Sequence, residues 1–131
     1  MITSEETRSI ISAAEEKAKE IGQPMNVAVV DAGTNLKTFH RMEDAWLGSI
    51  DIAINKAFTA ASFKLSTQEL AEMAQPGQPL FGIHTTNAGR VVVFAGGIPL
   101  ERDGEVVGAV GVSGGTVDQD QQVAEAGAAA F

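Results

Sequence analysis

The chain has 131 residues, of which 9 are lysine or arginine and 17 are aspartate or glutamate, so its net charge is −8. A chain of this length is typical of one compact domain, which we expect to span residues 1–131. Its basic residues form no cluster larger than a pair, which excludes the electrostatic footprint of a nucleic-acid-binding protein. The absence of cysteine excludes disulfides, thiolate nucleophiles and metal centres with Cys ligands.

The longest apolar stretches are too short for a membrane-spanning helix. Val91–Ile98 and Val106–Val112 fall well below the roughly 20 residues that cross a bilayer. The first residues, Met1–Glu6, carry neither the basic nor the apolar region of a signal peptide. We therefore expect a cytoplasmic protein that does not bind membranes.

The first third of the chain predicts a helix followed by a β-hairpin. Thr3 and Glu6 have capping-box spacing, and apolar residues then recur at helical intervals until Gly22 ends them. Asn26–Asp31 and Leu36–Met42 are rich in strand-forming residues and are separated by Gly and Asn. These two segments are expected to pair as antiparallel strands.

The middle of the chain predicts two helices and a long loop. Leu47–Phe63 places its apolar residues at the spacing of an amphipathic helix. Ser66 and Glu69 form a second capping box, which opens a short helix to about Met73. Ala74–Gly89 contains too many glycines and prolines for regular structure, and a loop of this length is often functional or part of an oligomer contact.

The last third predicts three strands. Arg90–Ala95 is a short strand that Gly96 and Gly97 break, and Ile98–Arg102 resumes it. Asp103–Gly104 is a strong two-residue hairpin signal, and Glu105–Ser113 is the returning strand. Because this returning strand is apolar without alternation, we place it in the centre of the sheet, covered on both faces.

Thr116 and Gln119 form a third capping box at the start of a last helix, from Val117 to about Ala130. Hairpins with helices before, between and after them predict an α+β fold. We expect a five-stranded antiparallel sheet flanked by helices in α/β/α layers. A doubly wound parallel sheet would need a helix between successive strands, and the two tight hairpin turns argue against it.

Two glycine pairs mark a candidate pocket for a small polar or anionic group. Where a buried strand passes through Gly114 and Gly115 into a helix start, backbone N–H groups are left without partners beside a gap that no side chain fills. Nearby cations and hydroxyls suit a carboxylate. The predicted ligand-binding residues are Arg41, Lys56, Thr59, Gly96, Gly97, Pro99, Gly114 and Gly115. Each also has a structural interpretation: surface ion pairing, a strand bulge, or close packing of helix on strand.

Any nitrogen-ligated metal or haem must use His40 or His84, the two histidines of the chain. His40 ends the second predicted strand and is the candidate metal ligand, whereas His84 lies in the long loop and is placed to reach a neighbouring subunit. Asp31, Asp120 and His40 are the candidates for moving a proton. Asp31 also suits a turn, Asp120 suits a helix N-terminus, and either histidine is equally a surface residue.

Six short motifs in fixed order resemble the GlcG/HbpS-like proteins, which are also similar to the C-terminal domain of PduO. The resemblance covers nearly the whole chain. It implies a profilin-like fold, a homo-oligomer, and an association with haem or corrinoid binding in some members and with glycolate or diol operons in others. The motifs are Val29–Gly33, Arg41–Ala45, Lys56–Ala60, Gly96–Leu100, Gly108–Gly115 and Asp120.

Three functional hypotheses follow. The first is an oligomeric small-ligand-binding protein of this family, with haem or another tetrapyrrole as the ligand. The second is a cofactor-independent enzyme for a small carboxylate or carbonyl compound, in which Arg41 and Lys56 hold the anion. The third is an accessory subunit of a metabolic operon. Alanine-rich helices with few aromatic residues, together with the long loop, also favour assembly into a homo-oligomer.

Overall fold

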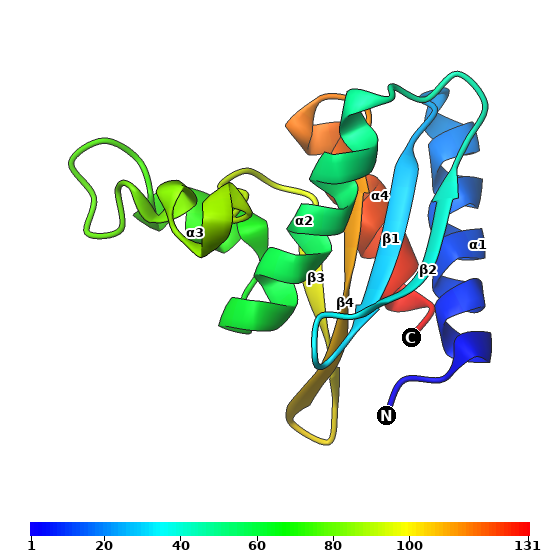
Figure 1. Cartoon of the computed structure of the whole chain (residues 1–131). Coiled ribbons are helices and arrows are strands. Elements are labelled where there is room, and N and C mark those ends of the chain that lie inside the picture. Colours follow the sequence, from blue (N-terminus) through cyan, green and yellow to red (C-terminus); the bar gives the residue numbers. More distant parts are fainter.

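The computed structural model describes residues 1–131 as three layers, with one antiparallel sheet between helices (Figure 1). The strands lie in the order β2-β1-β4-β3, and each neighbouring pair is antiparallel. The strands are β1 (Asn26–Asp31), β2 (Leu36–Arg41), β3 (Gly97–Arg102) and β4 (Glu105–Ser113). The helices are α1 (Ser4–Ile21), α2 (Gly48–Phe63), α3 (Thr67–Met73) and α4 (Val117–Ala129).

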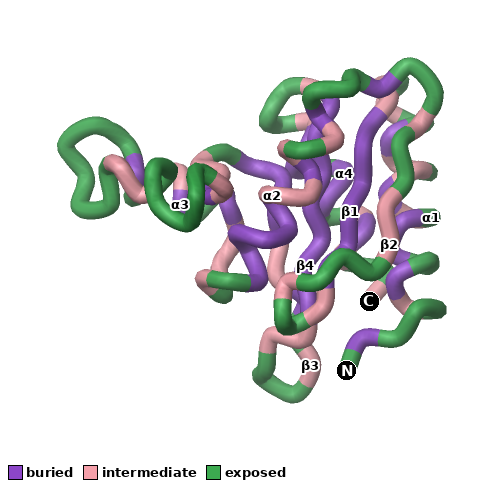
Figure 2. Tube along the Cα trace, in the orientation of Figure 1, coloured by how far each residue is buried: buried purple, intermediate pink, exposed green.

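The two faces of the sheet are covered by different kinds of side chain. Helices α1 and α4 pack on one face through a cluster dominated by Ile, Val, Leu and Met. Helix α2 packs on the other face through alanines of the helix and of the sheet, among them Ala53 and Ala57 of α2 and Ala109 of β4. Small side chains bring α2 very close to β4, and Figure 2 shows this part of the molecule as largely buried. The predicted central position of the returning strand is confirmed, because β4 lies between β1 and β3.

The local signals in the sequence are confirmed where they involve neighbouring residues. All three capping boxes are formed, at the starts of α1, α3 and α4. Gly22 ends α1 in the left-handed conformation. Asp103 and Gly104 both have positive φ angles, of 52° and 81°, as the tight turn between β3 and β4 requires.

The prediction of a fifth strand is wrong, because the sheet has four strands and Arg90–Ala95 is not one of them. This apolar segment binds a helix instead of a strand: the Val92 backbone N donates to the Thr59 hydroxyl at 3.0 Å. Thr59 in turn donates to the Asn55 carbonyl oxygen, 2.7 Å away within α2. The Thr59 side chain of α2 therefore accepts the hydrogen bond that the Val92 backbone N–H would otherwise donate to a neighbouring strand.

Helix α3 and the following loop, residues 67–89, form an arm that extends away from the three layers (Figures 1 and 2). The predicted irregular loop contains two single-turn 3₁₀ helices, Ile83–Thr85 and Asn87–Gly89. Its side chains are largely exposed, including Phe81. None of the helices combines the length and apolar character that a membrane-spanning segment needs.

Candidate functional site

A buried ion pair joins α2 to α4 beside the sheet. The Lys56 Nζ donates to Asp120 Oδ2 and to the backbone oxygen of Val112 in β4, each at 2.8 Å. The face of the Phe94 ring lies 4.9 Å from the same ammonium. The Lys56 side chain has no exposed surface, and that of Asp120 is 4% exposed. Two oppositely charged groups with these partners form a closed cluster.

Burial shifts both groups of this pair toward their neutral forms. Loss of hydration lowers the pKa of the Lys56 ammonium, and attraction to Asp120 works against that shift. Loss of hydration likewise raises the pKa of the Asp120 carboxyl, while Lys56 and the backbone N–H groups of Gly115 and Gly114 work against it. Each charge is therefore kept in the fold by the other.

The glycine bend at Gly96 and Gly97 wraps around the lysine. A Cβ atom on Gly96 would lie 2.7 Å from the Lys56 Nζ, and one on Gly97 would lie 2.5 Å from the Lys56 backbone oxygen. The freed N–H groups of the bend find side-chain acceptors: Gly96 N donates to Gln121 Oε1 and Gly97 N to Thr67 Oγ1. The space left by these two glycines is filled by protein atoms.

The second glycine pair lies at the same cluster, at the start of α4. Gly115 N donates to Asp120 Oδ1 at 2.9 Å, so this aspartate caps the helix start and also neutralises Lys56. A Cβ on Gly114 would lie 2.7 Å from the Pro24 backbone oxygen. The structure thus brings Lys56, both glycine pairs and Asp120 together, with the segment around Pro24 packed against them.

Arg41 does not join this cluster. It ends β2 and is exposed, while the Lys56 Nζ binds β4, and the intervening β1 separates those strands by two spacings, about 10 Å. The guanidinium that contacts α2 is that of Arg90, which donates to Asn55 Oδ1 and stacks 3.8 Å from the centre of the Phe58 ring.

The remaining predicted residues have structural partners. Asp31 Oδ1 accepts hydrogen bonds from the backbone N–H groups of Gly33 and Asn35, each at 2.9 Å, and so stabilises the turn between β1 and β2. Thr59 anchors Val92, as described above. Pro99 lies in β3, an edge strand of the sheet. Proline has no backbone N–H to donate, and edge strands tolerate this better than central strands.

His40 lies on the opposite edge strand, β2, and faces α1. Its Nδ1 contacts Glu15 Oε1, and no other atom bonds to the ring, so Nε2 has no partner. The histidine side chain is 49% exposed and the glutamate side chain 22%. A carboxylate that holds one ring nitrogen leaves the other available as a metal ligand.

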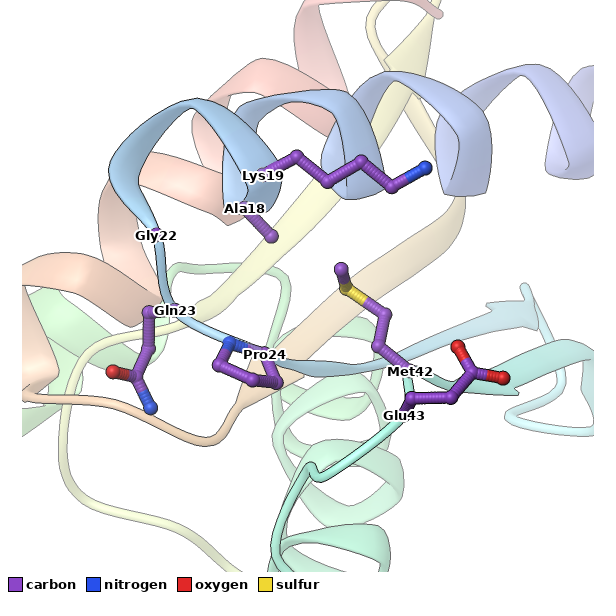
Figure 3. A pocket seen from close by; sticks show the side chains of 7 residues that line it. All are labelled: Ala18, Lys19, Gly22, Gln23, Pro24, Met42 and Glu43. Atoms are coloured by element: carbon purple, nitrogen blue, oxygen red, sulfur yellow. The ribbon is translucent and has the colours of Figure 1, made fainter.

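A shallow hollow lies between the end of α1, about one helical turn beyond Glu15, and the chain that follows β2 (Figure 3). Its volume is about 250 Å³. In Figure 3 the Met42 side chain points toward the helix that carries Ala18 and Lys19. The hollow is lined by Ala18, Lys19, Gly22, Gln23, Pro24, Met42 and Glu43.

His84 lies in the arm, exposed, with its ring edge-on to the Phe81 ring at 6.3 Å between centroids. It has no side-chain hydrogen bond, and no carboxylate lies beside it. Of the two histidines, His40 alone has a partner that orients its ring.

Sequence reasoning missed three contributors: Glu15 beside His40, Phe94 over Lys56, and Gln121 at the glycine bend. A signal for the buried pair was present, because Lys56 is the only charged residue between Asp51 and Lys64, in a helix rich in alanine and isoleucine, and a buried lysine requires a carboxylate. No comparable signal links Glu15 to His40, since the two are 25 residues apart on different elements.

The chain is similar to known proteins over nearly its full length. A sequence model of the HbpS-like family, described as "Haem degrading protein HbpS-like", matches residues 2–129. A 15.0 kDa protein from the dhaT-dhaS intergenic region of Citrobacter freundii is 46% identical over 124 residues, which cover 95% of this chain and 87% of that protein.

The corrinoid adenosyltransferase PduO of Salmonella typhimurium is 44% identical over 120 residues, which cover 91% of this chain but 35% of PduO. This chain therefore spans about a third of that enzyme. The crystal structure of a PduOC:heme complex is 38% identical, with a TM-score of 0.96, and covers 99% of this chain and 94% of that one. The agreement in sequence and in structure, from one end of the chain to the other, shows that the protein belongs to the HbpS-like family.

Proposed function

We propose that this protein binds haem or a closely related tetrapyrrole. The main support is the similarity of the whole chain to the protein of the PduOC:heme complex, at a TM-score of 0.96. We do not propose adenosyltransferase activity for this chain, because the chain matches only 35% of the length of PduO.

The residues present fit such a ligand. Haem needs an accessible nitrogen, sulfur or oxygen ligand for its iron, and His40 offers an unpartnered Nε2 on a half-exposed side chain. When bound, haem would supply a redox-active iron centre. This chain would hold that iron through one histidine and would contact the ring with side chains of α1 and β2.

The enzyme hypothesis for a small carboxylate has less support. It required Arg41 and Lys56 to hold one anion, but Arg41 ends the edge strand β2, whereas the Lys56 ammonium of α2 binds β4, with β1 between these two strands. The Lys56 ammonium already has a carboxylate partner, Asp120.

Titration of haemin into the purified protein tests the proposal. We expect a shifted Soret band that saturates at stoichiometric haemin, because a histidine nitrogen replaces water at the iron. The shift should be lost in His40→Ala and retained in His84→Ala, which serves as the matched control. An unshifted band in the wild-type protein would refute haem binding, and a normal shift in His40→Ala would refute this ligand.

We also propose that copies of the chain associate through the arm, residues 67–89. Three large apolar side chains of the arm are exposed: Met73 and Leu80 by 38% each and Phe81 by 60%. Apolar side chains gathered on a projecting segment favour contact with another copy. Light scattering at micromolar concentration should give a multiple of the monomer mass, and Phe81→Ser should lower it. A monomer mass for the wild-type protein would contradict this.

A further inference from the structure

We infer that the ligand site lies at the edge formed by α1 and β2, and that Glu15 is the positioning residue that makes His40 Nε2 the ligand atom. This inference rests on the proposed function and specifies where the tetrapyrrole binds. The contact between Glu15 and His40, together with the adjacent hollow, carries it.

The tautomer of the histidine follows from its partner. A carboxylate accepts hydrogen bonds and does not donate them, so the nitrogen that faces Glu15 must carry the proton in the neutral ring. That nitrogen is Nδ1. The lone pair is then on Nε2, which is the nitrogen without a partner in the fold. A carboxylate in this position fixes the ring orientation and makes the opposite nitrogen a better ligand.

The hollow lies a short distance along the chain from this pair on both supporting elements. Side chains alternate along an extended strand, so His40 and Met42 lie on the same side of the chain. Residues three and four apart lie together on a helix, so Glu15 is on the same face of α1 as Ala18 and Lys19. Met42, Ala18 and Lys19 all line the hollow. The hollow therefore begins two residues after His40 along the chain and one helical turn after Glu15 along α1.

The chemistry of the lining suits the edge of a tetrapyrrole. Pro24 and Met42 offer apolar contacts, the exposed Lys19 offers a cation for a carboxylate substituent, and Glu43 places one anion in the same lining. A volume of about 250 Å³ accepts part of such a ring, and the remainder would lie along the open edge of the sheet. His84 has neither a hollow nor an orienting carboxylate, so the observations favour His40.

Nitrogen-15 NMR of the neutral histidine rings tests the positioning role without haem. The wild-type protein should show His40 protonated on Nδ1. Glu15→Ala should shift the proton toward Nε2, whereas Glu15→Gln keeps an acceptor oxygen and should largely retain the Nδ1–H form. Glu16→Ala, an exposed neighbour in the same helix, should change nothing.

Haemin titrations of the same variants complete the test. Loss of an orienting partner typically weakens metal binding about 10- to 100-fold, so Glu15→Ala should raise the Kd for haemin by that factor while Glu16→Ala leaves it unchanged. Equal affinities in Glu15→Ala and the wild type, or an Nε2–H tautomer in the wild type, would overturn the inference. Absence of haemin binding in a wild type that still shows Nδ1–H would instead refute the proposed function.

Discussion

Replacing Asp120 by asparagine is expected to lower the free energy of unfolding by about 3–5 kcal/mol, because it leaves the Lys56 ammonium buried without a counter-charge. Small domains are stable by about 5–15 kcal/mol in total, so this one change would remove a large part of the margin. Urea unfolding followed by circular dichroism measures it. Asp120 opposes the loss of hydration that lowers the pKa of Lys56, and in the variant only the Val112 oxygen and the Phe94 ring remain beside the ammonium.

Two further variants make this result specific. Asp118 lies in the same first turn of α4 but is exposed, so Asp118→Asn should change the unfolding free energy by less than about 1 kcal/mol. The double variant Lys56→Met/Asp120→Asn removes both charges and should recover much of the stability lost in Asp120→Asn. If Asp120→Asn and Asp118→Asn unfold at the same urea concentration, the pair does not stabilise the fold.

Gly111→Ala is the second substitution expected to have a large effect. A Cβ at this position in β4 would lie 2.1 Å from the Ala53 backbone oxygen and 2.5 Å from the Ala57 backbone nitrogen. Both are backbone atoms of α2, so the whole helix would have to move away from the sheet. We expect a loss of about 3 kcal/mol or more in unfolding free energy, or failure to fold, since overpacking in a closely packed layer is rarely absorbed.

Gly48→Ala is the matched control for this experiment. Gly48 is the first residue of α2, and a Cβ there would meet nothing within 4 Å. The alanine should leave stability unchanged or raise it by up to about 1 kcal/mol, because it restricts the unfolded chain. Thermal unfolding curves of the two variants should differ widely. Coincident curves would show that α2 and β4 are not packed as closely as described.

Elements whose signals are local were predictable, and elements defined by distant partners were not. Thr3 and Glu6 form hydrogen bonds to each other's backbone, and Asp103 and Gly104 adopt the positive φ angles of their own turn. The geometry of both pairs therefore follows from residues close together in the sequence. Arg90–Ala95 has the apolar composition of a strand, but its backbone binds the Thr59 side chain instead of a neighbouring strand. Composition alone does not distinguish these two sets of hydrogen-bond partners.

The candidate sites follow the same division. The convergence of Lys56 with both glycine pairs was predicted from their chemistry. The group that pairs with the Lys56 ammonium, however, is the Asp120 carboxylate, 64 residues away in the sequence. Arg41 was assigned to that cluster because the sequence does not show which side of the sheet an edge strand joins. His40 is a candidate ligand from its residue type alone, whereas its contact with Glu15 depends on the packing of α1 against β2.

Binding of a tetrapyrrole at the edge of α1 and β2 is tested most directly by mapping the amide chemical shifts of the labelled protein as gallium protoporphyrin IX, a diamagnetic haem analogue, is added. We expect the largest changes within residues 15–24 of α1 and its end, and within residues 38–43 around His40. Changes that cluster instead in residues 80–89 of the arm, with the α1 and β2 amides unmoved, would contradict this assignment.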